Sequence, residues 1–193
     1  MKCLTKAAVS LFSFLVSSLP LSAEEAKDYS QSLTLQGANF NLKATNHGSM
    51  NNLSIEADYS GHKIFEKHRE IDGTFSGAEI ADLNSDGSPE IYIYLNSAGS
   101  GSYGSVIAYA MNKKHSVTEI YMPNLLDDPN LSRGYMGHDE FSIIENSLGR
   151  RFPIYVNGDT NAKPSGGKRQ LEYKLIPGEA GWLLKVVNQT DFK

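Results

Sequence analysis

Short runs in which apolar and polar side chains alternate recur along the chain from Ser32 onward. A period of two residues places the apolar side chains on one face of a β-strand, so each run predicts a half-buried strand. Seven runs of this kind are Leu33–Leu35, Phe40–Leu42, Leu53–Ile55, Phe141–Ile144, Phe152–Val156, Leu171–Leu175 and Trp182–Val187.

Two further runs in the middle of the chain, Ile91–Leu95 and Val106–Met111, are apolar at almost every position. A strand without a polar face is buried on both sides, so these two runs predict the central strands of the fold. The segment between them, Asn96–Ser105, is ten residues with three glycines and four serines. It therefore predicts a loop longer than the two to five residues that usually join a hairpin.

The predicted strands are separated by residues that favour turns, because Gly and Asn reach positive φ and Pro fixes φ near the turn value. Many short strands at intervals of about 8–12 residues are typical of an all-β fold. We expect a single-domain antiparallel β-sandwich over residues 24–193, with a barrel as the alternative. The longest strand-free segment is Met122–Gly137, where Pro129 precedes the one helical turn that we expect. The turn-forming segments are Tyr59–Gly61, Ile71–Gly73, Asn157–Asp159, Pro164–Gly167 and Pro177–Glu179.

The N-terminus has the pattern of a secretory signal peptide. Lys2 and Lys6 precede an uncharged apolar run, Ala7–Leu21, and small residues at Ser22 and Ala23 precede an abrupt change to charged residues. This order predicts a signal peptide over residues 1–23, cleaved after Ala23, and a periplasmic mature protein. The run is shorter than the roughly 20 residues that cross a bilayer, so we expect no membrane anchor.

Composition narrows the classes of partner. The whole chain has a formal charge of −4, and removing a leader that contains Lys2, Lys6 and no acidic residue brings it to −6. An acidic surface favours a basic partner and argues against nucleic acid and anionic lipid. The one cysteine, Cys3, lies in the leader, which excludes a disulfide, a thiolate metal site and a cysteine nucleophile from the mature chain. The oligomeric state is open, and a homodimer is compatible with this composition.

The loop between the two apolar runs is the first candidate site. Excess length on a rigid scaffold is where binding residues concentrate. Tyr103 is the one large side chain of the loop, and a tyrosine fills a pocket while still donating a hydrogen bond. The alternative is a surface loop with an incidental tyrosine.

The segment Asp82–Glu90 is the second candidate. Oxygen-bearing side chains at Asp82, Asn84 and Asp86, followed by a glycine, resemble the start of a calcium loop. The EF-hand pattern requires a glutamate where this chain has Ile93, and the similar loops of β-propeller repeats occur in series. We therefore favour a tight Asx-type turn, with a calcium-dependent carbohydrate-binding or adhesion module as the alternative function.

Signals of enzymatic chemistry are weak. The five histidines share no metal-ligand spacing, and Arg150 to Tyr155 predicts either a basic rim or a sheet edge that Pro153 keeps from pairing. Carboxylates such as those of a glycosidase are present, but their position near turns favours a solvated surface. We expect a protein that is not an enzyme and needs no cofactor. The carboxylates concerned are Asp127, Asp128, Asp139 and Glu140.

The motif Ser100-Gly101-Ser102-Tyr103 between two apolar strands of an exported β-domain resembles the inhibitory loop of the periplasmic inhibitors of invertebrate-type (I-type) lysozyme. The turn at Asp82–Glu90 is similar to that family too. So is a series of C-terminal residues: Arg151, Phe152, Pro153, Gly158, Asp159, Asn161, Pro164, Gly166, Gly167, Arg169, Tyr173, Gly181 and Trp182.

The resemblance implies a β-sandwich inhibitor whose loop enters the cleft of a lysozyme. Ser100 and Tyr103 would contact the enzyme, and Gly101 and Ser102 would shape the turn. Related inhibitors of chicken-type lysozyme use a similar serine and tyrosine together with a second, lysine-containing motif, which this sequence does not have. The resemblance therefore points to the I-type enzyme as the partner.

Overall fold

The computed structural model describes residues 27–193, so the predicted signal peptide lies outside the described residues. Twelve strands and one short 3-10 helix, η1 (Leu125–Asp127), make up the regular structure of this part of the chain. No helix in it is long and apolar enough to cross a membrane. The strands are β1 (Tyr29–Leu35), β2 (Ala38–Ala44), β3 (Met50–Tyr59), β4 (His62–Asp72), β5 (Thr74–Ala81), β6 (Glu90–Asn96), β7 (Gly104–Asn112), β8 (Ser116–Tyr121), β9 (Glu140–Ile144), β10 (Ser147–Pro153), β11 (Lys168–Pro177) and β12 (Trp182–Phe192).

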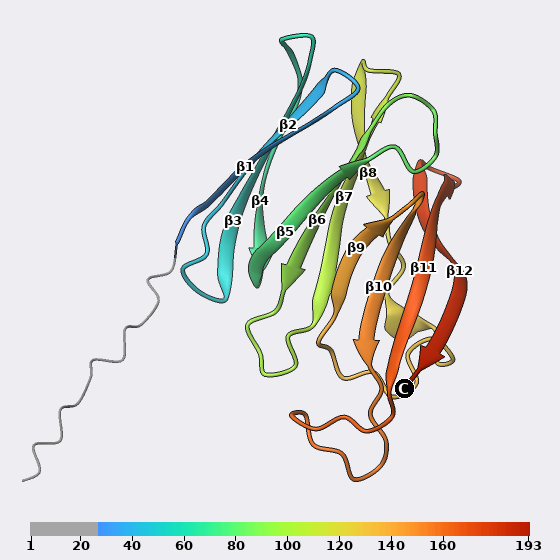
Figure 1. The fold of residues 1–193 in the computed structure, drawn as a ribbon. Coiled ribbons are helices and arrows are strands. Elements are labelled where there is room, and N and C mark those ends of the chain that lie inside the picture. The colour runs from blue at the N-terminus through green and yellow to red at the C-terminus, as the bar shows by residue number, and fades with distance from the viewer. Residues whose placement is uncertain (1–26) are drawn as a thin grey trace, which may run out of the picture.

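The strands form two sheets (Figure 1). The first has the order β1-β2-β3-β4, and the second has the order β5-β6-β7-β8-β12-β11-β10-β9. All neighbouring strands are antiparallel except β8 and β12, which run parallel over a short register at Trp182 and Leu183. The prediction of an all-β fold is confirmed, and one parallel pair is added to the expected antiparallel arrangement.

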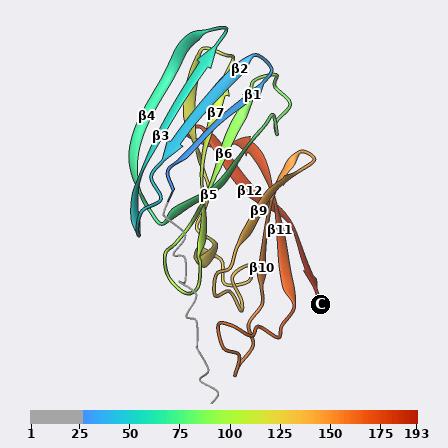
Figure 2. The same cartoon turned by 60° about the vertical axis from the view of Figure 1, so that its left-hand side comes forward.

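The architecture combines features of a sandwich and of a barrel. The four-stranded sheet packs face to face on β5–β7, as Figure 2 shows from the side. The eight-stranded sheet curls so that its two edge strands meet. Glu79 of β5 joins these edges, since its Oε2 accepts hydrogen bonds from Tyr94 Oη at 2.6 Å and from the backbone N–H of Ile143 in β9 at 2.9 Å.

The chain passes from one sheet to the other at Gly73, between β4 and β5. Its φ of +111° is in the region that favours glycine, and a Cβ there would lie 2.2 Å from the carbonyl oxygen of Asn96. A residue with a side chain would therefore displace the end of β6. The turn predicted at this glycine is the crossing point between the two sheets.

Strands β6 and β7 form the centre of the fold. Ile91, Ile93 and Leu95 of β6 point into the core shared with the four-stranded sheet. Tyr92 and Tyr94 point into a second core inside the curled sheet, against residues of β8–β12. Because successive side chains of a strand alternate between faces, burial on both faces requires an apolar residue at nearly every position. The prediction that these two runs are central strands is confirmed.

Three strands were not predicted from the sequence. Strand β4 is mostly polar and exposed and lies at the edge of its sheet, so alternation is weak along it. Strands β5 and β8 were also missed; β8 is short, with a single buried residue. One hydrogen-bonded turn follows Pro129, as expected, since the backbone N–H of Ser132 donates to the carbonyl of Asp128 at 3.0 Å, and η1 precedes it as an additional short helix.

Candidate functional site

The loop between β6 and β7 lies at the lower end of the molecule in Figure 1, and seven residues, 97–103, connect the paired ends of the two strands. Its base is closed by the backbone N–H of Ser97, which donates to the carbonyl of Tyr103, and by the N–H of Tyr103, which donates to Ser97 Oγ, both at 2.9 Å. At its tip the N–H of Ser102 donates to the carbonyl of Gly99 at 2.9 Å. Ser102 has a φ of +41°, so the tip is a tight turn.

A segment far away in sequence supports this loop from one side. The backbone N–H of His138 donates to the carbonyl of Gly101 at 2.7 Å, and the N–H of Gly104 donates to Asp139 Oδ2 at 2.7 Å. Gly137 permits this approach, since a Cβ at that position, with φ of +90°, would lie 2.0 Å from the carbonyl oxygen of Gly101. Backbone and carboxylate contacts therefore fix the loop at both ends of the Ser100–Tyr103 motif.

Asp139 is itself held by a buried ion pair. Its Oδ1 accepts a hydrogen bond from Arg150 Nε at 2.7 Å, and its Oδ2 accepts one from Tyr135 Oη at 2.6 Å. The side chains of Arg150 and Asp139 are 7% and 0% exposed. Burial opposes the charge of Arg150, but the adjacent carboxylate of Asp139 raises its pKa above the ordinary value. Burial also raises the pKa of Tyr135.

These contacts correct two expectations from the sequence. Arg150 is not part of a basic rim or a sheet edge, because β10 lies between β9 and β11 and the guanidinium is buried. Asp139 does not belong to a solvated surface, because it is enclosed beneath the loop. A charged residue looks the same in sequence whether it is solvated or paired, so the tertiary contact alone reveals this ion pair.

Tyr103 rests on the aromatic side chains above that ion pair. Its ring meets Tyr135 edge-on, with 5.6 Å between centroids, and Tyr135 meets Phe152 in the same way at 4.8 Å. The guanidinium of Arg150 lies 5.2 Å from the centroid of Tyr135. Tyr103 nevertheless remains 47% exposed. Tyr103 is therefore a large amphipathic side chain that packs on Tyr135 along one edge and is about half open to solvent.

The C-terminal part of the chain reaches the loop through Asn161. Its Nδ2 donates to the carbonyl of Ser100 at 2.7 Å, and its Oδ1 lies 3.2 Å from His138 Nε2. Its own carbonyl accepts a hydrogen bond from Tyr155 Oη at 2.9 Å. Asn161 was one of the residues that carried the family resemblance, but its contact with Ser100 could not be derived from the sequence.

Comparison with known proteins gives a match over the part of the chain that contains this loop. Residues 56–128 match the sequence model of the family described as "Periplasmic lysozyme inhibitor of I-type lysozyme". The match confirms the family resemblance. The matched residues include Ser100 and Tyr103, whereas the C-terminal series that was also similar to the inhibitor family lies beyond them.

A solved structure with the same description is also similar to this chain. It is the crystal structure of PliI-Ah, the periplasmic lysozyme inhibitor of I-type lysozyme from Aeromonas hydrophyla. The two chains are 24% identical, the similarity covers 48% of this chain and 85% of the other, and the TM-score is 0.43. No curated protein matches the chain.

The family match also includes the acidic loop at the opposite end of β6, which joins β5 to β6 at residues 82–89. Asp82 Oδ1 and Asn84 Oδ1 both accept the backbone N–H of Asp86 at 3.0 Å, Asp82 Oδ2 accepts that of Gly87 at 2.9 Å, and Asp86 Oδ1 accepts that of Ser88 at 2.8 Å. These hydrogen bonds confirm the Asx-type turn predicted from the sequence.

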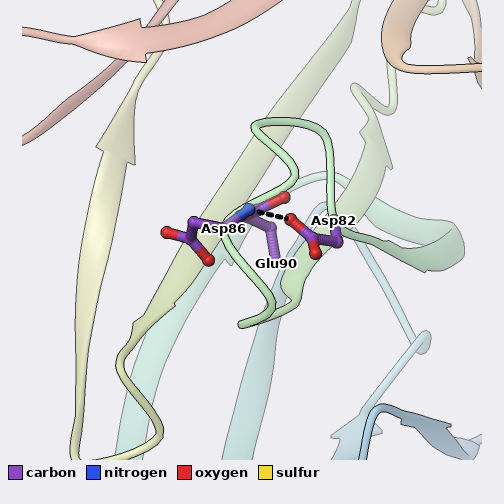
Figure 3. A group of neighbouring side chains, drawn as sticks. All are labelled: Asp82, Asp86 and Glu90. Carbon is purple, nitrogen blue, oxygen red and sulfur yellow. Dashed lines mark hydrogen bonds between the residues drawn. The ribbon is translucent and has the colours of Figure 1, made fainter.

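The residue directly after this loop, Glu90, lies in an unexpected environment. It is the first residue of β6, it is fully buried, and its carboxylate gathers with those of Asp82 and Asp86 (Figure 3). Burial, together with those two carboxylates, raises the pKa of Glu90 to about 8. The sequence placed Glu90 at the end of the motif but gave no sign that it would be buried.

Proposed function

We propose that this protein inhibits a lysozyme by inserting the Ser100–Tyr103 loop into the active-site cleft, with an I-type enzyme as the target. The observation that carries the proposal is the presentation of Tyr103, which is 47% exposed on a loop held by His138, Asp139 and Asn161. The family match over the same residues supports it.

The chemistry of a lysozyme cleft fits this loop. Such a cleft holds a carboxylic acid and a carboxylate on either side of the scissile bond. Hydroxyl groups of Ser100 and Tyr103 would donate to these carboxyl groups as sugar hydroxyls do, and the ring of Tyr103 would occupy a sugar subsite. Because the loop is already fixed by tertiary contacts, little conformational entropy is lost on binding.

The surroundings of Tyr103 resemble the centre of a protein interface. Met136 lies on the segment beneath the loop and Leu126 on η1, and both side chains are exposed. Apolar side chains around a tyrosine anchor exclude water from it, as in binding hot spots. Asp127 and Asp128 lie beside Leu126 and are also exposed, and an acidic rim would raise the association rate with a cationic lysozyme.

We infer that the mature protein acts in the periplasm after removal of residues 1–23. The leader pattern supports this location, which is also where the inhibitors of the matched family act. N-terminal sequencing of the protein recovered from the periplasm should begin at Glu24. A sequence that begins at Met1 would contradict export by cleavage.

The direct test is to titrate the purified mature protein into I-type, chicken-type and goose-type lysozymes while following the lysis of cell walls. We expect dose-dependent inhibition of the I-type enzyme at the lowest concentration. Incubation of the cell walls with this protein alone should give no lysis, since it has no proposed catalytic residues. If none of the three enzymes is inhibited, the proposal is wrong.

A further inference from the structure

The acidic loop has a feature that the Asx-type turn does not explain. One carboxylate oxygen from each of Asp82, Asp86 and Glu90 lies within 4.8 Å of the other two. When they are charged, three carboxylates at this separation repel one another, and the hydrogen bonds that Asp82 and Asp86 accept come from backbone N–H groups and side-chain amides rather than from a positively charged side chain.

The burial of Glu90 makes a negative charge at this place still less favourable, because the residue is 0% exposed. Its Oε2 accepts hydrogen bonds from the backbone N–H of Leu83 at 2.8 Å and from Tyr92 Oη at 3.4 Å. Its Oε1 is buried without a hydrogen-bond partner among the described residues. A buried carboxylate oxygen without a donor is strongly disfavoured, so it points to a ligand that supplies positive charge.

We propose that Asp82, Asn84, Asp86 and Glu90 form a binding site for a calcium ion. All four side chains offer oxygen atoms, the ligands of hard divalent cations, and Zn²⁺ would instead favour histidine or cysteine. Two oxygens bound to one calcium ion at 2.3–2.6 Å lie at most about 5 Å apart, whereas around Mg²⁺ the limit is about 4.2 Å. One oxygen of each of the three carboxylates lies within 4.8 Å of the others, so a single ion can contact all of them, and calcium accepts an irregular set of oxygens whereas Mg²⁺ demands near-ideal octahedral geometry.

The position of the site gives the ion a structural role. Asp82 Oδ2 also accepts a hydrogen bond from Gln36 Nε2 at 2.8 Å, and Gln36 lies in the turn between β1 and β2. A bound ion would thus fix the start of β6 and, through Asp82, the contact between the two sheets. The site lies at the other end of β6 from Tyr103, so it is independent of the proposed inhibitory loop and does not depend on the proposed function.

Thermal unfolding of the mature protein tests the site directly. After treatment with a chelator, the protein is titrated with calcium chloride and, separately, with magnesium chloride, and calorimetry records the heat of binding. At a calcium concentration about a hundredfold above Kd, Tm should rise by about 5–10 °C, and the rise with magnesium should be smaller. No rise in Tm and no heat with calcium in the millimolar range would overturn the proposal.

Two variants and one control locate the ion. Glu90→Gln keeps the shape of the side chain and an acceptor for Leu83 while removing the charge, so calcium binding should weaken by about tenfold or more. Asp86→Asn, at an exposed position, should weaken calcium binding as well and serves if Glu90→Gln does not fold. Asp127→Asn, an exposed acid on η1, is the control and should keep the full response. A wild-type calcium response in both Glu90→Gln and Asp86→Asn would place the ion elsewhere and overturn the assignment.

Discussion

The two loops at the ends of β6 are built in opposite ways. The loop at residues 82–89 is shaped largely by its own side chains, because Asp82, Asn84 and Asp86 accept backbone N–H groups two to five residues further along the chain. The loop at residues 97–103 is held largely by residues far away in sequence, namely His138, Asp139 and Asn161. About 20 Å of strand separates them.

The strand β6 therefore carries at one end a loop shaped by its own residues and at the other end a loop shaped by distant segments of the chain. A loop that makes its own hydrogen bonds keeps its shape wherever the strand ends. A loop of glycines and serines has few side chains of its own to do so, and it becomes ordered only when other segments pack against it. Changes to distant residues should therefore alter the second loop, and changes within the first should remain local.

The largest expected effect comes from the ion pair beneath the second loop. Asp139→Ala would leave Arg150 buried without its partner and would remove the acceptor of the Gly104 N–H. We expect a loss of about 3–5 kcal/mol in the free energy of unfolding, measured with urea. Asp127→Ala, an exposed control, should change it by less than about 0.5 kcal/mol. A loss below about 1 kcal/mol for Asp139→Ala would mean that the loop does not depend on this pair.

Tyr103→Ala should separate binding from stability. The side chain is half-exposed and its main packing partner is Tyr135, so Tm should change little. Inhibition of lysozyme should weaken by about 2 kcal/mol or more, roughly thirtyfold or greater. Tyr121→Ala, at an exposed tyrosine of β8, is the matched control and should inhibit like the wild type. Unchanged inhibition by Tyr103→Ala would remove the loop from the mechanism.

Ser100→Ala should have a smaller effect on inhibition, about 0.5–3 kcal/mol according to whether the hydroxyl donates to a neutral or a charged group. The fold should be unaffected, because Asn161 is bound by the backbone carbonyl of Ser100 rather than by its side chain. If both hydroxyls reach the same pair of carboxyl groups, the losses in Ser100→Ala/Tyr103→Ala should be non-additive. Additive losses of binding free energy would show that the two residues contact separate places on the enzyme.

Asn161→Ala tests whether the order of the proposed inhibitory loop depends on a residue far away in the sequence. It removes the donor to the Ser100 carbonyl without touching the surface of Tyr103. We expect inhibition to weaken by about 0.5–1.5 kcal/mol, roughly two- to tenfold, through a looser loop. Hydrogen exchange at the amides of residues 99–102 should become faster in the variant. Unchanged exchange together with unchanged inhibition would show that the loop is ordered without Asn161.

Asp82→Ala should have the smallest effect on inhibition. In the presence of a chelator its main effect is on stability: it removes the acceptor of the Asp86 and Gly87 N–H groups and of Gln36 Nε2, and it lowers the free energy of unfolding by about 1–3 kcal/mol. Inhibition should remain at the wild-type level, since the change lies at the far end of β6. A variant that unfolds normally but no longer inhibits would show that the two loops are coupled.

The sequence by itself determined the fold class, the central pair of strands and the Asx-type turn. Each depends on neighbouring residues: alternation sets which face of a strand is buried, uninterrupted apolar residues require burial on both faces, and an aspartate binds N–H groups close to it in the chain. It also marked Asn96–Ser105 as a long glycine- and serine-rich loop. Two of the strands it missed, β4 and β8, are mostly exposed, so that little burial constrains the order of their side chains.

Only the tertiary structure decided what holds Tyr103 in place and what surrounds Glu90. Arg150 and Asp139 read in sequence as solvated charges, yet they pair in the interior. Asn161 and Ser100 are brought together by a fold that joins residues 61 positions apart. The physical reason is that the charge state and burial of a polar side chain depend on which distant segments pack against it, and a local pattern of residues contains no record of those segments.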